Sequence, residues 1–141
     1  MREDTTAIEP IGRHVLVDFH GIPSAELINE SKLVELLLRA LEQAGFNVID
    51  HCSHRFPGQQ SGITAMALLS ESHATIHTYP EYGYAALDVF SCGRPDPERV
   101  IRFMAGVLQP TRIETHEQSR GLSAKNSGNQ LLISGQSRSV R

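Results

Sequence analysis

The sequence predicts an α+β fold, a two-layer sandwich in which two helices cover one face of a mostly antiparallel sheet. Two segments have apolar residues at helical spacing, and six shorter segments have the apolar or alternating pattern of strands. The segments follow one another as strand, helix, strands, helix and strand, and short turns join the consecutive strands. This order is typical of an α+β domain.

The chain begins with a predicted strand and the longest predicted helix. Apolar and polar residues alternate in residues 14–19, as they do in a strand with two different faces. Residues 23–44 are predicted to form the helix, because leucines and other apolar residues recur at steps of three and four. Gly45 is a typical helix stop, and a second strand begins at residues 46–49.

The second helix has a clear start and a clear end. Asp96 is predicted to cap it, and Pro97 to occupy its first position. The helix carries an apolar stripe and ends before Pro110. A loop at residues 56–60 follows the second strand. The remaining predicted strands are 63–69, 74–79, 85–90 and 111–115.

The composition favours a single cytoplasmic domain. The 141 residues have a net charge of −3, so no basic surface for nucleic acid is expected. No apolar run is long enough to span a membrane, and the first residues lack the apolar segment of a secretory signal. The two cysteines, Cys52 and Cys92, are therefore expected to stay reduced.

Both ends of the chain are predicted to lie outside the folded domain. Residues 1–11 are predicted to be a flexible arm. Residues 121–141 are rich in Ser, Gly, Asn and Gln and contain no acidic residue, so they are predicted to be a disordered tail. The folded domain is then residues 12–120.

The most informative stretch is residues 70–86, which places serines, glutamates and histidines beside an apolar strand. In it, the bond between Glu71 and Ser72 stands close to His73 and His77. A Glu-Ser bond in such surroundings can rearrange, because the serine hydroxyl can attack the preceding carbonyl carbon and form an ester. A base then removes the serine α-proton, and elimination and hydrolysis leave a pyruvoyl group at a new N-terminus. That group is an electron sink made from protein.

From about residue 12 to about residue 121, the sequence resembles the bacterial and archaeal S-adenosylmethionine decarboxylases, which depend on a pyruvoyl group. The resemblance lies first in residues 71–84, which read Glu-Ser-His-x-Thr-Ile-His-Thr-x-Pro-Glu-Tyr-Gly-Tyr. It implies a two-layer α/β sandwich that works as a homodimer. The other matching motifs are Gly12-Arg13-His14, His54-Arg55-Phe56, Ser61-Gly62 and Asp88-x-Phe90-x-Cys92-Gly93.

The resemblance implies that the chain is cut between Glu71 and Ser72, and that Ser72 becomes the covalent pyruvoyl cofactor. His77 would be the base in this processing, with Ser61 in support. Cys92 would protonate the α-carbon of the substrate after CO₂ leaves a Schiff base. The product, decarboxylated S-adenosylmethionine, would then donate aminopropyl groups for spermidine synthesis.

Three further residues are implied to bind the substrate. Phe56 would stack on adenine beside the cationic sulfonium, and Glu81 would bind the ribose hydroxyls. Tyr79 stands where the family often has Trp, and the loop after Phe56 is shorter and more polar than usual. Asp18 matches an acidic residue on the first strand. Because the two departures lie near the nucleoside end of the site, a pyruvoyl-dependent ornithine or arginine decarboxylase is the alternative with the same chemistry.

Each of these residues also has a purely structural interpretation. A serine often satisfies turn donors, and a cysteine often packs as a small apolar residue. A metal-binding or interacting protein is the alternative of a different class. No metal is expected, because the spacing of the possible ligands matches no compact zinc pattern. These possible ligands are His51, Cys52, His54, His73, His77 and Cys92.

The spacing of Ser72 and His77 limits how they can react. Five residues of extended strand span ~16 Å, so the two side chains cannot meet on one straight strand. Either the chain bends sharply between them, or His77 acts on Ser72 of a second protomer. The resemblance implies the second arrangement, a site shared across a homodimer.

Overall fold

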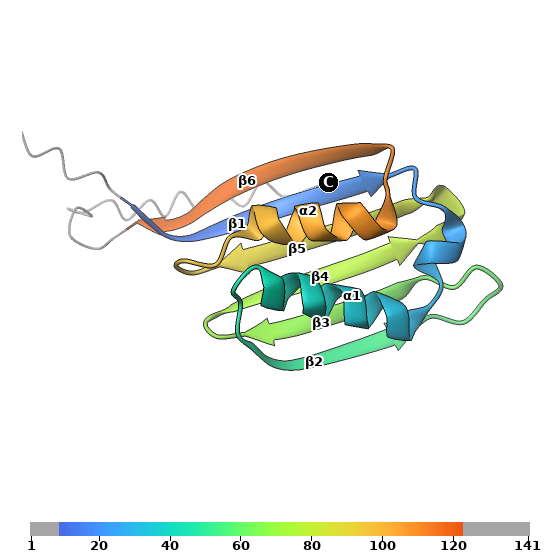
Figure 1. Cartoon of the computed structure of the whole chain (residues 1–141), viewed down its shortest axis with the longest axis horizontal. Coiled ribbons are helices and arrows are strands. Elements are labelled where there is room, and N and C mark those ends of the chain that lie inside the picture. Colours follow the sequence, from blue (N-terminus) through green and yellow to red (C-terminus); the bar gives the residue numbers. More distant parts are fainter. Residues whose placement is uncertain (1–8, 123–141) are drawn as a thin grey trace, which may run out of the picture.

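The structure is a computed structural model, and it describes residues 9–122 of the chain. A single six-stranded sheet has the order β2-β3-β4-β5-β1-β6, and all neighbouring strands are antiparallel. Both helices lie on the same face of the sheet (Figure 1). The predicted α+β sandwich is therefore confirmed. The elements are β1 (Pro10–His20), η1 (Ser24–Leu27), α1 (Glu30–Gln43), β2 (Val48–Arg55), β3 (Ile63–Leu69), β4 (Ser72–Tyr79), η2 (Pro80–Tyr82), β5 (Tyr84–Ser91), α2 (Pro97–Leu108) and β6 (Arg112–Leu122).

The first helix starts later than predicted. A separate 3-10 turn, η1, precedes α1, and Asn29 caps α1 because its side-chain oxygen accepts the Lys32 N–H at 3.1 Å. The carbonyl of Leu27 in η1 accepts the Thr78 hydroxyl of β4 at 2.9 Å, which holds the turn against the sheet. Apolar residues recur at helical spacing through both η1 and α1, so the sequence pattern could not reveal that two separate elements are present. The second helix begins at Pro97 behind the Asp96 cap, as predicted.

The apolar core fills the layer between the sheet and the helices. In β3, β4 and β5 every second side chain is buried beneath the helices, as the strand period requires. Both helices point an apolar stripe at the same layer. The largest fully buried side chains are Phe19, Leu27, Leu33, Leu37, Leu41, Ile63, Leu69, Ile76, Met104, Leu108, Val89 and Val100.

The last strand is longer than predicted. β6 extends along the whole of β1, from Arg112 opposite His20 to Leu122 opposite Pro10. The sequence of β6 is polar, so its residue pattern gives little indication of a strand. Its length is set by the pairing with β1. The boundaries predicted at residues 11 and 121 therefore fall inside strands, and the rest of the predicted arm and tail lies outside the described residues. Within residues 9–122, no helix is long and apolar enough to cross a membrane.

The face of the sheet opposite the helices is not covered by any described part of the chain (Figure 1). It carries the histidines, aspartates and tyrosines of β1, β4 and β5. Exposed apolar side chains also lie there, with exposed fractions of 44% for Leu16, 46% for Met66 and 55% for Leu68. The fold therefore has one apolar inner face and one uncovered face of mixed chemistry, here called the open face.

Thr78 is predicted to stabilise the junction between β3, β4 and η1. Its buried hydroxyl accepts the Ile63 N–H and donates to the Leu27 carbonyl, both at 2.9 Å. Thr78→Val would leave both backbone groups without this partner, so we expect the free energy of unfolding to fall by about 2 kcal/mol. Urea denaturation followed by circular dichroism, in an uncleaved Ser72→Ala background, measures this change. Thr115→Val, at an exposed position on β6, is the control and should change it little. Equal stability of the two variants would contradict the assignment.

Candidate active site

The residues singled out in the sequence form two groups at opposite ends of β4. Five of them line one cavity of about 290 Å³ where β4 ends and η2 begins. Ser72 and Cys92 lie at the other end, because β4 begins at Ser72 and its next residue pairs with Phe90, two residues before Cys92. The five residues that line the cavity are Phe56, Ser61, His77, Tyr79 and Glu81.

Two of the cavity residues are held by side chains that sequence reasoning missed. The hydroxyl of Thr64 on β3 lies 2.8 Å from Nδ1 of His77, its cross-strand neighbour. The side chain of Arg55 donates from Nε to Oγ of the buried Ser61 at 2.8 Å. Because a guanidinium can only donate, the Ser61 hydroxyl proton remains free for another acceptor. Arg55 belongs to a motif noted in the sequence, but only the pairing of strands brings Thr64 to His77.

An aromatic row extends from the cavity across the open face. The rings of Tyr79 and Tyr84 stack with centroids 5.5 Å apart, and those of Tyr84 and His20 with centroids 5.3 Å apart. The Tyr84 hydroxyl donates to Asp18. Burial, together with this hydrogen bond, raises the pKa of Tyr84 to about 12. Asp18, predicted as an acidic site residue, thus holds Tyr84 and does not line the cavity.

The predicted cleavage site lies in the tight turn between β3 and β4. Glu71 has a φ of +58°, in the left-handed region that residues other than glycine seldom adopt. Backbone in this region is strained for a residue with a side chain, and such strain is often found at functional sites. The Ser72 hydroxyl donates to the Ser70 carbonyl at 3.2 Å. Strain of this kind cannot be read from the sequence.

β4 is not bent between Ser72 and His77. Its pairing with β3 and β5 continues without a register shift from one end to the other. The two residues are therefore ~16 Å apart along the strand, which is too far for contact. Of the two arrangements that the sequence left open, the sharp bend is the one that the structure contradicts.

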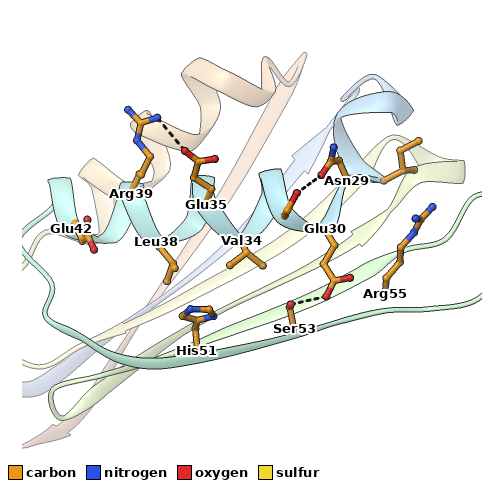
Figure 2. Close-up of a pocket in the computed structure, with 12 residues that line it drawn as sticks. Asn29, Glu30, Val34, Glu35, Leu38, Arg39, Glu42, His51, Ser53 and Arg55 are labelled. Atoms are coloured by element: carbon orange, nitrogen blue, oxygen red, sulfur yellow. Dashed lines mark hydrogen bonds and ion pairs between the residues drawn. The ribbon is translucent and has the colours of Figure 1, made fainter.

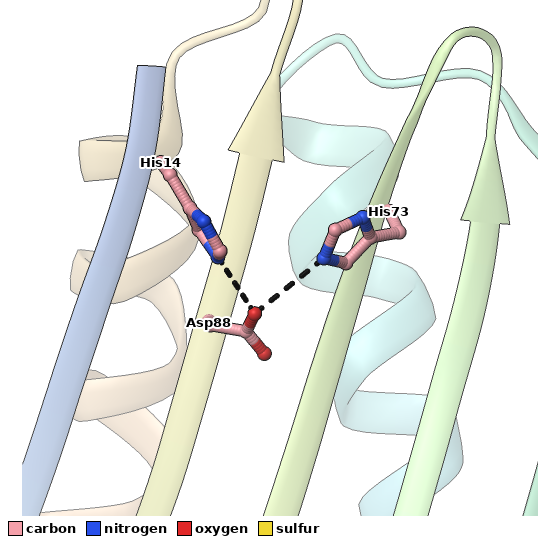
Figure 3. A group of neighbouring side chains, drawn as sticks. All are labelled: His14, His73 and Asp88. Atoms are coloured by element: carbon pink, nitrogen blue, oxygen red, sulfur yellow. Dashed lines mark hydrogen bonds and ion pairs between the residues drawn. The ribbon is translucent and has the colours of Figure 1, made fainter. Parts of the chain in front are cut away.

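The cysteines and most of the possible metal ligands are dispersed. Cys92 is partly buried and Cys52 is exposed, and both are free thiols. Of the six candidate ligands, His73 alone lies in a group of close ligating atoms within residues 9–122, with His14 and Asp88 on the open face (Figure 3). A second such group consists of Asp18, His20 and Glu114.

A larger cavity lies elsewhere. A groove of about 980 Å³ separates α1 from the edge strand β2 on the helix side of the sheet (Figure 2). The Ser53 hydroxyl donates to Glu30 across it at 2.7 Å, and Val34 and Leu38 provide apolar surface. None of the predicted site residues lines this groove, so its size does not mark it as the active site.

These observations define a small α+β sandwich whose sheet carries a serine in a strained turn, a cysteine at the same end, and a histidine in a cavity at the other end. The chain belongs to the S-adenosylmethionine decarboxylase family, whose sequence profile matches residues 13–121. A solved relative, the adenosylmethionine decarboxylase from Aquifex aeolicus, has a TM-score of 0.72 and 33% identity, over 84% of this chain and 98% of that one.

Curated relatives carry two names. The S-adenosylmethionine decarboxylase proenzyme of Caldicellulosiruptor saccharolyticus is 36% identical, over 79% of this chain and 90% of that protein. The arginine decarboxylase proenzyme of Ignicoccus hospitalis is 40% identical, over 78% of this chain and 77% of that protein. Both relatives are similar to this chain over most of its length. Sequence identity alone therefore does not decide between the two substrates that their names give.

Tyr84 gives the site a measurable pH dependence. Its pKa is about 12 in the folded chain and 10.0 ordinarily, so the folded state favours the protonated ring. The resulting stability is present in full below about pH 10 and is lost as the pH rises toward about 12. Between about pH 10 and about pH 12, the free energy of unfolding of wild type, measured by urea denaturation, should therefore fall relative to that of Tyr84→Phe, because the variant has no ring hydroxyl to titrate. Tyr82→Phe, at an exposed ring, should follow wild type. Parallel curves for wild type and Tyr84→Phe up to about pH 12.5 would contradict the shift.

Proposed function

We propose that this protein is a self-processing, pyruvoyl-dependent decarboxylase that converts S-adenosylmethionine to decarboxylated S-adenosylmethionine, the aminopropyl donor for spermidine synthesis. The observation that carries this proposal is the cavity at the end of β4. Two stretches of the chain, residues 56–64 and 77–81, meet there and bring Phe56, His77 and Glu81 to one cavity. They provide an aromatic ring, an imidazole and a carboxylate, which suit a nucleoside and a proton transfer.

The processing step uses Ser72 and the bond before it. Its hydroxyl oxygen attacks the carbonyl carbon of Glu71, and the peptide C–N bond breaks to give an ester. A base then removes the α-proton of residue 72, and elimination releases Glu71 as a carboxylate. Hydrolysis of the remaining aminoacrylate gives ammonia and a pyruvoyl group on the new N-terminus. The left-handed backbone of Glu71 supports this proposal, because cleavage would release its strain.

His77 is proposed as the base and Ser61 as its support. The contact between Thr64 and Nδ1 of His77 fixes the ring, so that Nε2 remains to accept the α-proton of residue 72. Arg55 fixes the oxygen of Ser61 and leaves its hydroxyl proton to hydrogen-bond the ester. Both reactive groups are thus oriented by neighbours before processing begins.

Turnover needs an electron sink and a proton donor. The pyruvoyl group derived from Ser72 supplies the sink for the electron pair that remains when CO₂ leaves. We assign the proton donor to Cys92, a partly buried thiol at the same end of the sheet as Ser72. A thiol at this place can protonate the α-carbon of the substrate.

The residues that line the cavity favour S-adenosylmethionine over arginine or ornithine as the substrate. Phe56 is half exposed there, and its open ring face is available to stack on a base. Among residues 9–122, Glu81 is the single acidic residue that lines the cavity, and a ribose diol suits one carboxylate. The guanidinium of Arg55, which contacts Ser61 beside the cavity, would repel a second guanidinium. Because one relative is named an arginine decarboxylase proenzyme, arginine or ornithine is the alternative substrate.

A homodimer is proposed to assemble the complete site. Ser72 and His77 lie ~16 Å apart on one strand, so the cavity of one subunit must meet the Ser72 end of another. The open face offers the surface for this contact, because it has exposed Leu16, Met66 and Leu68 among its polar groups. Two antiparallel copies joined through this face would form two identical sites.

The first test is the intact mass of the purified protein. We expect two chains, one that ends at Glu71 and one that begins with a pyruvoyl group at position 72, and a single chain for Ser72→Ala. The processed enzyme should release CO₂ from S-adenosylmethionine at least about tenfold faster than from arginine or ornithine, a difference of about 1.4 kcal/mol. An uncleaved but active wild type would exclude the pyruvoyl mechanism. Faster release from arginine would reassign the substrate and leave the processing intact.

The shared site can be tested by mixing two inactive chains. Ser72→Ala and His77→Ala homodimers should both stay uncleaved. A co-expressed mixture should cleave part of the His77→Ala chains, since the mixed dimer pairs an intact Ser72 with an intact His77. Mass spectrometry identifies which chain is cut, and Tyr82→Phe in place of His77→Ala is the control that cleaves by itself. A mixture that stays whole, although mixed dimers are isolated by two affinity tags, would contradict the proposal.

A further inference from the structure

A network of side chains on the open face connects His73, the second residue after the proposed cleavage site, to strands β5 and β1. Asp88 on β5 stands at its centre (Figure 3). One of its carboxylate oxygens, Oδ2, lies 2.8 Å from Nε2 of His14 on β1 and 3.5 Å from Nε2 of His73 on β4. Its other oxygen accepts the hydroxyl of Thr75. His73 follows Ser72 directly, so this network reaches within one residue of the proposed pyruvoyl group.

The contact with Arg120 selects the tautomer of His14. Its guanidinium lies 3.2 Å from Nδ1 of His14 and can only donate, so Nδ1 is the acceptor. The proton of the neutral ring is then on Nε2, from which it is donated to Asp88. Asp88 is thereby fixed by two donors, from His14 and Thr75, and its negative charge faces His73.

The ring of His73 is also held by packing. Its centroid lies 5.6 Å from that of His14 in an edge contact and 5.8 Å from that of Phe90. Phe90 is the direct cross-strand neighbour of His73, and such pairs stabilise a sheet. A contact with the Asp88 carboxylate and two ring contacts thus act on one side chain at the start of β4.

After cleavage, the start of β4 depends on these contacts to stay in place. In the intact chain the tight turn at Ser70 and Glu71 ties the start of β4 to β3. Once the bond after Glu71 is broken, β4 begins at residue 72, and free strand ends tend to fray. A pyruvoyl group on a frayed end would lose its alignment with the substrate, and misplacement by about 1 Å can cost a hundredfold in rate.

We propose that Asp88, oriented by His14 and Thr75, anchors His73 and so positions the pyruvoyl group after cleavage. This role rests on the proposed processing at Ser72. Asp88 is a positioning residue in this scheme, since it acts on the reactive group through His73. The network is needed for turnover, and it is not needed while the turn at Glu71 is intact.

A metal ion is the competing explanation for the same three residues. Their ligating atoms lie within 4.8 Å of one another, and two histidines with a carboxylate are common metal ligands. A histidine that binds a metal through Nε2 carries its proton on Nδ1, where Arg120 would then oppose it. The contact with Arg120 therefore favours the anchor.

The test compares Asp88→Asn with wild type as full-length, processed enzyme. We expect the intact mass to show normal cleavage, KM for S-adenosylmethionine to stay within about twofold, and kcat to fall by between about tenfold and about a hundredfold. Thr75→Val, which removes one donor to Asp88, should show a smaller fall in kcat. Asp50→Asn, at an exposed aspartate of β2, is the matched control and should keep the wild-type kcat.

Hydrogen exchange separates an anchor from an ordinary structural role. In cleaved Asp88→Asn, the amides of residues 73–76 should exchange faster than in cleaved wild type. In the uncleaved Ser72→Ala background, Asp88→Asn should leave their exchange unchanged, because the turn still holds the strand. Faster exchange in both backgrounds would reduce Asp88 to general stability and overturn the anchor.

The remaining outcomes are also decisive. A cleaved Asp88→Asn enzyme with wild-type kcat and exchange would overturn the anchor and leave the proposed function intact. An Asp88→Asn chain that folds but stays uncleaved would move the network into processing and likewise overturn it. One equivalent of zinc in wild type, lost in Asp88→Asn, would replace the anchor with a metal site. An uncleaved wild type would show that the proposed function itself had failed.

Discussion

The unbroken pairing of β4 with β3 and β5 is the constraint on which the rest of the structure depends. It holds β4 straight, so Ser72 and His77 stay at different ends of one strand. It also places alternate residues of β4 on opposite faces, with Ile76 in the core and His77 on the open face. A site that uses both ends of β4 is therefore beyond the reach of a single chain, and a second copy is the simplest way to complete it.

The two layers of the fold divide structural and chemical roles between the faces of the sheet. The helices cover one face, and the apolar side chains beneath them form the core. The open face can accept polar groups because no described helix covers it, and the chain places Asp18, His73, Tyr84 and Asp88 there. Their hydrogen bonds join neighbouring strands, so the geometry of these groups is set by the backbone ladder.

Side chains of the proposed site are held by residues from other strands. Thr64 holds His77, Arg55 holds Ser61, and the network around Asp88 holds His73. Orientation by neighbours of this kind reduces the freedom that a catalytic group must lose during reaction. The groove between α1 and β2 is larger, but in it the Ser53 hydroxyl and the Glu30 carboxylate are hydrogen-bonded to each other across the surface.

The sequence by itself determined the fold class, the second helix and its cap, and the strand at 63–69, and it pointed to five of the residues that line the cavity, because these depend on local spacing or on a long multi-part resemblance. Tertiary structure decided the rest. Asn29, which sits within an apolar pattern that continues past it, caps α1, so the helix begins only after η1 has ended. The polar β6 is a strand because β1 pairs with it. The partners Thr64 and Asp88 are distant in sequence from the residues they hold, and the left-handed backbone of Glu71 is set by a turn between paired strands, so neither leaves a local signal.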